Sequence, residues 1–383
     1  MIFFTFCSFI FKFFVLVLAA PVLLNSCKSN KEKLNSSEPE LVLKLIPSKN
    51  NPRNSEGDFI NLKDGRILFV YSHYTGDSSS DHAPAHLAGR ISEDGGKTWT
   101  TEDKIILQNE GGMNVMSVSL LRLQNGDIAL FYLRKNSTED CIPFMRISED
   151  ETQTWSDAVQ CITDKKGYFV LNNDRVIQLN GGRLLMPVAL HNTPDGEWKN
   201  KADLYCCFSD DNGKTWTSGK KVPNTTEVVT QEPGVIEMQD GRIMMYIRAS
   251  GGFQQVSFSA DRGETWSHIK TSNIPSPLSP ATIEKVPGTK DWLLVWNNND
   301  GSNPDTKGYR TPQTVAVSKD EGKSWENIKN LHTDPDGWYC YTAIHFVNNK
   351  EILLGYCAGN RPAGTGLSVT NITKFETEWL YKK

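Results

Sequence analysis

One eight-residue pattern occurs five times in this chain and constrains its fold more than any other feature. The copies are SEDGGKTW from Ser92, SEDETQTW from Ser148, SDDNGKTW from Ser209, SADRGETW from Ser259 and SKDEGKSW from Ser318. We call this pattern, Ser-x-Asp-x-Gly-x-Thr-Trp, the Asp box after its aspartate. Its recurrence indicates a fold built from structural repeats.

Each Asp box predicts a turn between two strands, because an alternating apolar run such as residues 314–317 precedes it. The short Asp and Ser side chains can hydrogen-bond nearby backbone amides in such a turn. The Trp can pack beneath it and bury a large apolar ring. The second copy has Thr152 where the others have Gly, so we expect that turn to be strained or altered.

A second repeat consists of apolar runs broken by a turn dipeptide, which predicts β-hairpins. The copies are FINLKDGRILFVY from Phe59, LLRLQNGDIALFY from Leu120, VIQLNGGRLLMPV from Val176, VIEMQDGRIMMYI from Val235, and the looser IEKVPGTKDWLLVW from Ile283 and AIHFVNNKEILLGY from Ala343. Hairpins roughly 50 to 60 residues apart leave room for four short strands each. We therefore predict an all-β fold, a six-bladed β-propeller of four-stranded blades, whose last blade lacks a legible Asp box.

Composition fits one globular domain after a leader, since 38% of the residues are apolar and 10% aromatic. We predict a signal peptide over residues 1–26, a tether over 27–40 and the propeller over 41–383. The formal net charge of −4 and the absence of a basic stripe argue against a general role on nucleic acid or membrane surfaces. We expect a monomer.

The leader resembles that of a bacterial lipoprotein. An apolar stretch over residues 13–18 is followed by Leu24-Asn25-Ser26-Cys27, which is similar to a lipobox with Cys27 as the lipidated residue. We expect an outer-membrane or cell-surface protein that contacts the membrane only through this lipid; a plain secretory signal or an uncleaved anchor helix is the alternative.

The remaining cysteines show no metal-ligand spacing. Most are expected to be buried thiols, although Cys141 and Cys161 could pair in an oxidising compartment. We expect neither a metal nor an organic cofactor.

Strand order places the hairpin turns and the Asp boxes on one face of the propeller, so the opposite, upper face can be read from the residues farthest from each hairpin. These residues are polar: Arg53, Asn114, Asn172, Asn173, Asp174, Arg175, Glu232 and Tyr341 before the first strands; His73, Arg134, His191, Arg248 and Asn297 after the second; Asp81, His82 and Arg310 before the third. A solvated rim is polar in any propeller. Three arginines aimed at one axis, however, would repel one another without an anion, which predicts a site for an acidic small ligand.

The chain resembles the sialidases, which are six-bladed propellers with Asp boxes, over essentially its whole length after the tether. The resemblance implies a carboxylate-binding arginine triad of Arg53, Arg248 in MMYIRASGG and Arg310 in YRTPQTVAVSKDEGKSW. It implies a tyrosine nucleophile, Tyr341 in GWYCYTAIHF, a glutamate that assists it, Glu232 in QEPGVIEMQDGR, and an acid/base aspartate, Asp81 in SSSDHAPAHLAGRISEDGG. His73, Asn114 and Asp174 are further candidates for substrate binding.

Two motifs depart from the family pattern. The first arginine lies in Pro52-Arg53-Asn54-Ser55 rather than in an aromatic-Arg-Ile-Pro motif, and His73 or a neighbour replaces a further arginine. Tyr339 competes with Tyr341 as the nucleophile, because alternation along a strand predicts that both face the same side.

Three functions remain open at this point. The resemblance implies a retaining exo-glycosidase that releases a terminal acidic sugar, sialic acid or a related keto-deoxy acid, from a glycan. A relative with the same fold could instead cleave another terminal sugar, rhamnose or a uronate of an acidic plant or algal polysaccharide, using His73, His82 or His191. The third possibility is a non-catalytic glycan-binding propeller, which turnover would exclude.

Overall fold

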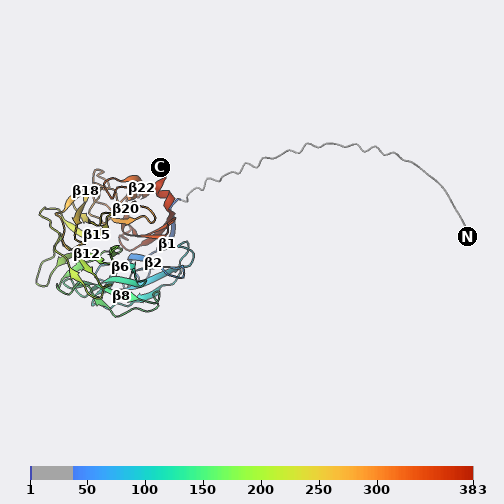
Figure 1. The fold of residues 1–383 in the computed structure, drawn as a ribbon, viewed down its shortest axis with the longest axis horizontal. Helices are drawn as coiled ribbons and strands as arrows, with labels where there is room; N and C mark the ends of the chain where they lie inside the picture. The colour runs from blue at the N-terminus through green and yellow to red at the C-terminus, as the bar shows by residue number, and fades with distance from the viewer. Residues whose placement is uncertain (2–37, 383) are drawn as a thin grey trace. The chain divides into compact units, whose positions relative to one another are not determined.

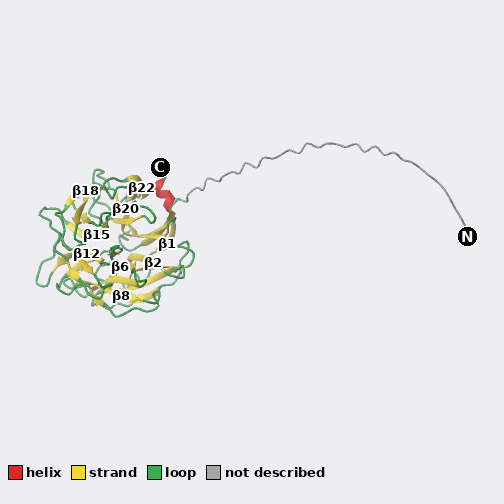
Figure 2. Cartoon of the chain, viewed as in Figure 1, coloured by secondary structure: helices red, strands yellow, loops and turns green. Residues whose placement is uncertain are grey.

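The computed structural model describes Met1 and residues 38–382, and the strands within residues 40–376 form a ring of antiparallel sheets around a central axis (Figure 1). Apart from Met1, the predicted signal peptide, Cys27 and most of the predicted tether lie outside the described residues. Strands account for nearly all regular structure, and the single helix among the described residues, α1 (Thr377–Tyr381), follows the last strand (Figure 2). None of the helices described is long and apolar enough to cross a membrane.

Blades one to three follow the predicted order of strands from the axis outward. Blade one contains β2 (Asn54–Asn61), β3 (Ile67–Tyr74), β4 (Ala85–Ser92) and β5 (Lys104–Leu107); blade two β6 (Asn114–Arg122), β7 (Ile128–Lys135), β8 (Cys141–Ser148) and β9 (Val159–Gln160); blade three β11 (Ile177–Gln178), β12 (Leu184–Asn192), β13 (Asp203–Ser209) and β14 (Thr217–Ser218). The short β10 (Tyr168–Val170) pairs with both β8 and β12, so blades two and three form one continuous nine-stranded sheet.

Blades four to six complete the ring and confirm the six-bladed fold. Blade four contains β15 (Thr230–Glu237), β16 (Ile243–Ala249), β17 (Phe253–Ser259) and β18 (Lys270–Pro275); blade five β19 (Thr282–Lys285), β20 (Trp292–Asn297), β21 (Gln313–Ser318) and β22 (Glu326–His332); blade six β23 (Gly337–Asn348), β24 (Glu351–Asn360), β25 (Thr370–Glu376) and β1 (Glu40–Leu45).

Blade six explains why the sequence shows only five Asp boxes. Its outermost strand is β1, from the N-terminal part of the propeller, which pairs antiparallel with β25 from Glu40↔Lys374 to Leu45↔Thr370. In Figure 1 the blue β1 accordingly lies beside the red C-terminal end of the chain. No turn is needed between the third and fourth strands of this blade, and the ring is closed by backbone hydrogen bonds between its two ends.

The Asp boxes form the predicted turns through a repeated set of hydrogen bonds. In the first, the Asp94 carboxylate accepts from the Thr98 amide at 2.9 Å and from the Thr98 hydroxyl at 2.7 Å, while the Gly96 amide donates to Ser92 Oγ at 2.8 Å. In the second box Thr152 keeps the corresponding bond to Ser148 Oγ at 2.8 Å, but its φ is +70°. The turn is therefore unaltered in its hydrogen bonding and strained in its backbone, since a β-branched residue rarely adopts that conformation.

The core lies between the faces of adjacent blades. Alternate residues of the second and third strands place apolar side chains in this layer. The large fully buried side chains include Trp292, Phe69, Phe131 and Tyr356. The six described cysteines are buried and free, Cys141 and Cys161 among them. This rigid ring fixes the upper ends of the inner strands, where the candidate site lies.

Candidate active site

A bulge near the upper end of the inner strands turns selected side chains toward the axis. The pairing register shifts within β2, β6, β15 and β23, at Ser55/Asp58, Met116/Ser119, Gln231/Pro233 and Cys340/Ala343. In each bulge one non-glycine residue has positive φ: Glu56 at 56°, Ser117 at 58°, Glu232 at 40° and Tyr341 at 54°; Asp174, just before β11, has 54°. Such backbone costs roughly 1 to 3 kcal/mol per residue and is concentrated at functional sites.

Tyr341 and Glu232 form a hydrogen-bonded pair across the axis. The Tyr341 hydroxyl donates to Glu232 Oε1 at 3.1 Å, and Arg248 Nη1 donates to the same oxygen at 2.6 Å. Burial raises the pKa of Glu232, but the positive charges of Arg248 and Arg310 outweigh it, so the net shift is downward. Glu232 is therefore ionised and accepts a hydrogen bond from the Tyr341 phenol.

The phenol itself is neutral at rest. Burial, followed by the negative charge of Glu232, raises the pKa of Tyr341 well above its ordinary value, although Arg310 and Arg248 oppose the shift. Two polar atoms beside the pair are buried and lack a hydrogen-bond partner among the described residues: Glu232 Oε2 and Arg248 Nε. Unpaired buried polar atoms are costly, so their presence together indicates a place prepared for a polar ligand.

Arg310 completes this side of the site. Its guanidinium carbon lies 5.4 Å from the centre of the Tyr341 ring and 5.0 Å from that of Trp338, and Nη1 donates to Cys340 Sγ at 2.9 Å. Only one of its donor nitrogens is thereby bound to a side chain, which leaves the rest of the guanidinium fork for an anion.

The bulge also overturns the expectation that Tyr339 and Tyr341 face the same side. Tyr339 stacks on His332, with ring centres 4.8 Å apart, in the apolar layer between blades five and six. The extra residue between Cys340 and Ala343 breaks the two-residue alternation, so Tyr341 alone turns to the axis.

Arg53 lies in a second cluster, with Glu56 and Asp81. Arg53 Nη2 donates to Glu56 Oε1 at 2.7 Å, Nη1 donates to Asp81 Oδ1, and Nε donates to Ser55 Oγ at 2.8 Å. Its side chain is 2% exposed whereas that of Asp81 is 55% exposed. The predicted triad is thus divided: Arg248 and Arg310 border Tyr341, and Arg53 is bound to two carboxylates.

Glu56 was not anticipated from the sequence, although a signal for it exists. Glu56, Ser117 and Glu232 each precede the left-handed glycine of their own hairpin by nine residues, so they occupy equivalent places in the repeat. Burial raises the pKa of Glu56 despite the charge of Arg53. Ser117 Oγ donates to its second oxygen, Oε2.

The two clusters belong to one site. Asn173 Nδ2 donates to the carbonyl oxygens of Gly57 at 2.9 Å and of Tyr341 at 3.0 Å, which ties the two bulges together. Glu56 also contributes to the raised pKa of Tyr341, as expected for a charge nearby. Arg53, Asp81, Glu232, Arg248, Arg310 and Tyr341 therefore converge at the upper end of the axis.

The remaining candidates occupy supporting positions. Asn114 Nδ2 donates to the carbonyl oxygens of Asp81 at 2.9 Å and Ala83 at 2.8 Å, so it holds the loop that carries Asp81. His73, in contrast, stacks on His86 with ring centres 4.6 Å apart and places Nδ1 3.0 Å from Asp103 Oδ2. These contacts direct its side chain to the flank of blade one.

Asp174 lines a different cavity, of about 470 Å³, together with Asp58 and Glu284. Its Oδ2 accepts from the Ile344 amide at 2.9 Å. Burial raises the pKa of Asp174 to about 7 and that of Glu284 to about 8. Asp174 thus belongs to an axial group of carboxyls rather than to the Tyr341 cluster.

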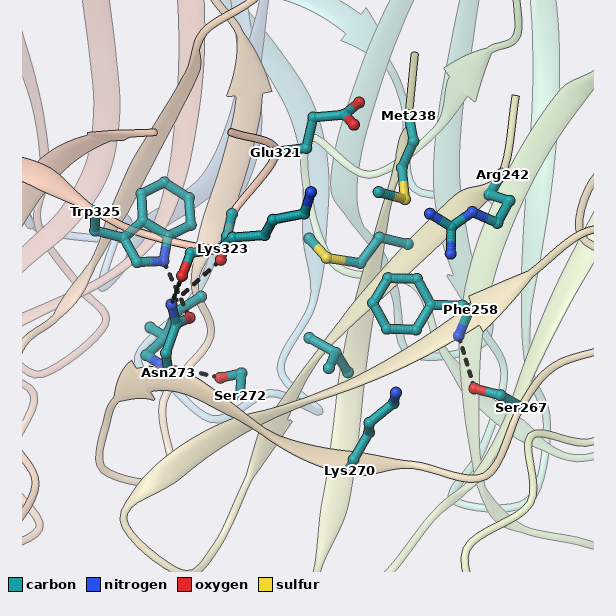
Figure 3. Close-up of a pocket in the computed structure, with 14 residues that line it drawn as sticks. Met238, Arg242, Phe258, Ser267, Lys270, Ser272, Asn273, Glu321, Lys323 and Trp325 are labelled. Atoms are coloured by element: carbon teal, nitrogen blue, oxygen red, sulfur yellow. Dashed lines mark hydrogen bonds between the residues drawn. The ribbon is translucent and has the colours of Figure 1, made fainter. Parts of the chain in front are cut away.

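A further cavity of about 610 Å³ lies between blades four and five (Figure 3). Met238, Phe258 and Trp325 line it, and Asn273 accepts from the Trp325 indole at 3.3 Å. None of the predicted site residues borders it. In the described part of the chain, no three His, Cys, Asp or Glu side chains are grouped to hold a metal ion.

A family model described as a BNR repeat-like domain matches residues 90–354. The chain belongs to this family. The match extends from the end of the third strand of blade one to the second strand of blade six.

The curated relatives include sialidases. The chain is 27% identical over 216 residues to a sialidase of Bacteroides fragilis, covering 55% of this chain and 38% of that protein, and 27% identical over 285 residues to a sialidase of Paraclostridium sordellii, covering 65% and 68%. The chain thus spans well under two thirds of the Bacteroides protein. The structure of a Hadza microbial sialidase superposes with a TM-score of 0.67 at 18% identity, covering 85% of this chain and 66% of that one, which shows the shared propeller fold.

Proposed function

We propose that this protein is a retaining exo-glycosidase of the sialidase type, which releases a terminal acidic sugar, sialic acid or a related keto-deoxy acid, from glycans. One observation carries the proposal: the Tyr341 hydroxyl donates to Glu232 at 3.1 Å, with Arg248 bound to the same carboxylate oxygen. The sialidases among the relatives support the same substrate class.

The chemistry explains the choice of a phenol. A carboxylate nucleophile would meet like charge at an anomeric carbon that bears a carboxylate, and a neutral phenol avoids this repulsion. Glu232 takes the phenolic proton as the Tyr341 oxygen attacks the anomeric carbon and the bond to the leaving oxygen breaks. Because the pKa of Tyr341 is raised, the proton leaves during the attack rather than before it.

The second cluster supplies the acid. Burial raises the pKa of Asp81, but the Arg53 ion pair outweighs it, so Asp81 is ionised at rest and unsuited to donate a proton. A substrate carboxylate competes with Asp81 for Arg53. Once Arg53 turns to the substrate, the ion pair that lowers the pKa of Asp81 is weakened, so this pKa rises and Asp81 can take up a proton from solvent in the loaded site.

Asp81 acts in both steps of the reaction, departure of the leaving group and hydrolysis of the intermediate. Asp81 protonates the leaving oxygen, and afterwards, as a carboxylate, it removes a proton from the water that attacks the anomeric carbon of the glycosyl–tyrosine intermediate. The Tyr341 oxygen leaves and recovers its proton from Glu232. Two displacements at one carbon give retention, and Arg248 and Arg310, together with Arg53 once it has left Asp81, hold the substrate carboxylate.

The test is turnover on a panel of sialylated glycans and acidic plant and algal polysaccharides, with released sugars measured by mass spectrometry. Tyr341→Phe should lower kcat by several orders of magnitude with little change in stability, since it removes only the nucleophilic oxygen. Tyr339→Phe is the matched control and should retain activity. No turnover of any substrate by the wild type would favour a non-catalytic glycan-binding propeller.

Release of rhamnose or a uronate would point to the histidine-based alternative. That result would require Tyr341→Phe to retain full activity while His73→Ala or His82→Ala is inactive. An inactive Tyr341→Phe variant supports the tyrosine mechanism, and an active one with an inactive histidine variant supports the alternative. The same set of variants therefore decides between the two mechanisms.

We also propose that the protein is held at the outer membrane or cell surface of a bacterium by a lipid on Cys27. The supporting feature is the Leu24-Asn25-Ser26-Cys27 segment behind an apolar leader. An extracytoplasmic location agrees with a glycan substrate.

A further inference from the structure

A continuous row of aromatic rings borders the candidate site on the side of blades one to three. His82 lies edge-on to Tyr168 at 6.4 Å, Tyr168 lies edge-on to Trp198 at 5.2 Å, and Trp198 stacks on His191 at 4.8 Å, all between ring centres. We call these four residues the aromatic row. None of them is needed for the chemistry proposed above.

The two ends of the row reach the two halves of the site. At one end, Lys135 Nζ donates to the Asp81 carbonyl oxygen at 2.7 Å and lies 5.3 Å from the centre of the Tyr168 ring. At the other end, the carbonyl oxygen of Asn200, two residues after Trp198, accepts a hydrogen bond from Gln231, the residue before Glu232. Trp198 lies between, at the rim of the site.

Trp198 has fixed contacts on one side yet is open to solvent on the rest of its surface. It is 51% exposed, whereas its neighbours Tyr168 and His191 are buried at 6% and 4%. One face of the indole is covered by His191, and its Nε1 donates to Asn200 Oδ1 at 3.3 Å. The exposed half of the indole therefore remains available for contact.

The connection between β12 and β13 that carries Trp198 is fastened to the site itself. His191 Nδ1 is 2.8 Å from the Lys199 carbonyl oxygen, and Gln231 Nε2 donates to the Asn200 carbonyl oxygen at 2.9 Å. Gln231 immediately precedes Glu232 in β15. The position of the indole is thus fixed relative to Glu232, which a platform for a bound ring requires.

We propose that Trp198 is a stacking platform for the sugar that the terminal acidic sugar is attached to, the leaving group of the reaction. This inference rests on the proposed function, because Asp81 must protonate the oxygen of that second sugar. The leaving sugar therefore lies on the Asp81 side, where the aromatic row begins. A pyranose presents an apolar face of C–H groups, which a fixed and half-exposed indole can cover.

The experiment compares two substrates on the full-length protein: the acidic sugar linked to galactose, and its methyl glycoside, which has no second ring. Trp198→Ala should lower the ratio of kcat/KM between these substrates about tenfold, equivalent to ~1.4 kcal/mol. Trp198→Phe, which retains an aromatic face, should restore most of the ratio. A ratio unchanged in Trp198→Ala would overturn the proposal.

A binding measurement separates this inference from the proposed function. In a Tyr341→Phe background, the affinity for the galactose-linked sugar is measured by calorimetry with and without Trp198→Ala. A loss of about tenfold supports the platform, and equal affinities refute it. Binding without any wild-type turnover would leave Trp198 as a glycan contact and refute only the hydrolase.

Discussion

Replacing Glu284 with glutamine should make the stability of this propeller less sensitive to alkaline pH. Glu284 shares the 470 Å³ axial cavity with Asp58 and Asp174. Burial, and then the charge of Asp174, raises its pKa to about 8. An unfolded glutamate titrates near a pKa of about 4.3.

The sign follows from which state holds the proton. Between pH ~4.3 and 8 the folded protein keeps a proton that the unfolded chain has lost, so the free energy of unfolding falls as pH rises, by ~1.4 kcal/mol per unit for one full proton. The free energy of unfolding stops falling above the pKa of Glu284 in the folded protein. Over this window it amounts to about 5 kcal/mol at most. Because Glu284 retains partial exposure to the cavity, we expect about half of that, ~2 to 3 kcal/mol.

The assay is urea unfolding at several pH values between 5 and 8.5, monitored by tryptophan fluorescence. Glu284→Gln cannot ionise, so the difference between variant and wild type reports the ionisation of Glu284 together with its effect on the neighbouring Asp58 and Asp174. The variant should gain stability relative to the wild type as pH rises. Glu227→Gln removes an exposed carboxylate after β14 and is the control that should follow the wild type. Parallel curves for wild type and Glu284→Gln would refute the reasoning.

Three other changes test separate parts of the molecule. Asp320→Ala removes the hydrogen bonds that Asp320 accepts from the Ser324 amide at 2.8 Å and from the Ser324 hydroxyl at 2.7 Å. The variant should therefore lose about 1 to 2 kcal/mol of stability, seen as a lower Tm, while the folded fraction keeps its turnover. A stable but inactive variant would contradict the placement of this Asp box on the face opposite the site. Arg310→Ala should weaken binding of carboxylated sugars by about 1.5 to 3 kcal/mol and spare uncharged ones, as calorimetry would measure; equal losses for both would oppose a role in anion binding. Cys27→Ser should abolish labelling of the protein by a fatty-acid analogue in cells, and equal labelling of both forms would exclude lipidation there.

The repeats made the fold predictable, because each hairpin and Asp box is a local signal. Turn dipeptides between alternating apolar runs mark every inner hairpin, and counting them gives the blades. The closure of blade six was not predictable in the same way. The segment ELVLKL of β1 pairs with β25, more than 300 residues away in sequence, and no local turn records that pairing.

The site was predictable only where the repeat itself positions a residue. Glu232 and Tyr341 occupy equivalent bulges, and the structure places them in hydrogen-bonding distance. The bulge is a single inserted residue that alternation cannot reveal, which is why Tyr339 seemed equivalent to Tyr341. The binding of Arg53 by Glu56 and Asp81 depends on pairing across a loop, and local sequence does not specify such contacts.

The closure of blade six has a consequence for synthesis. β1 is the first strand of the propeller to leave the ribosome, and its partner β25 is among the last. Until β25 emerges, β1 has no neighbour and its edge is open to pairing with other chains. The blades between them can form in order as they appear, but the ring becomes a closed circle only after β25 has emerged. A ribosome stalled before Thr370 would therefore hold an open arc of blades rather than a smaller propeller.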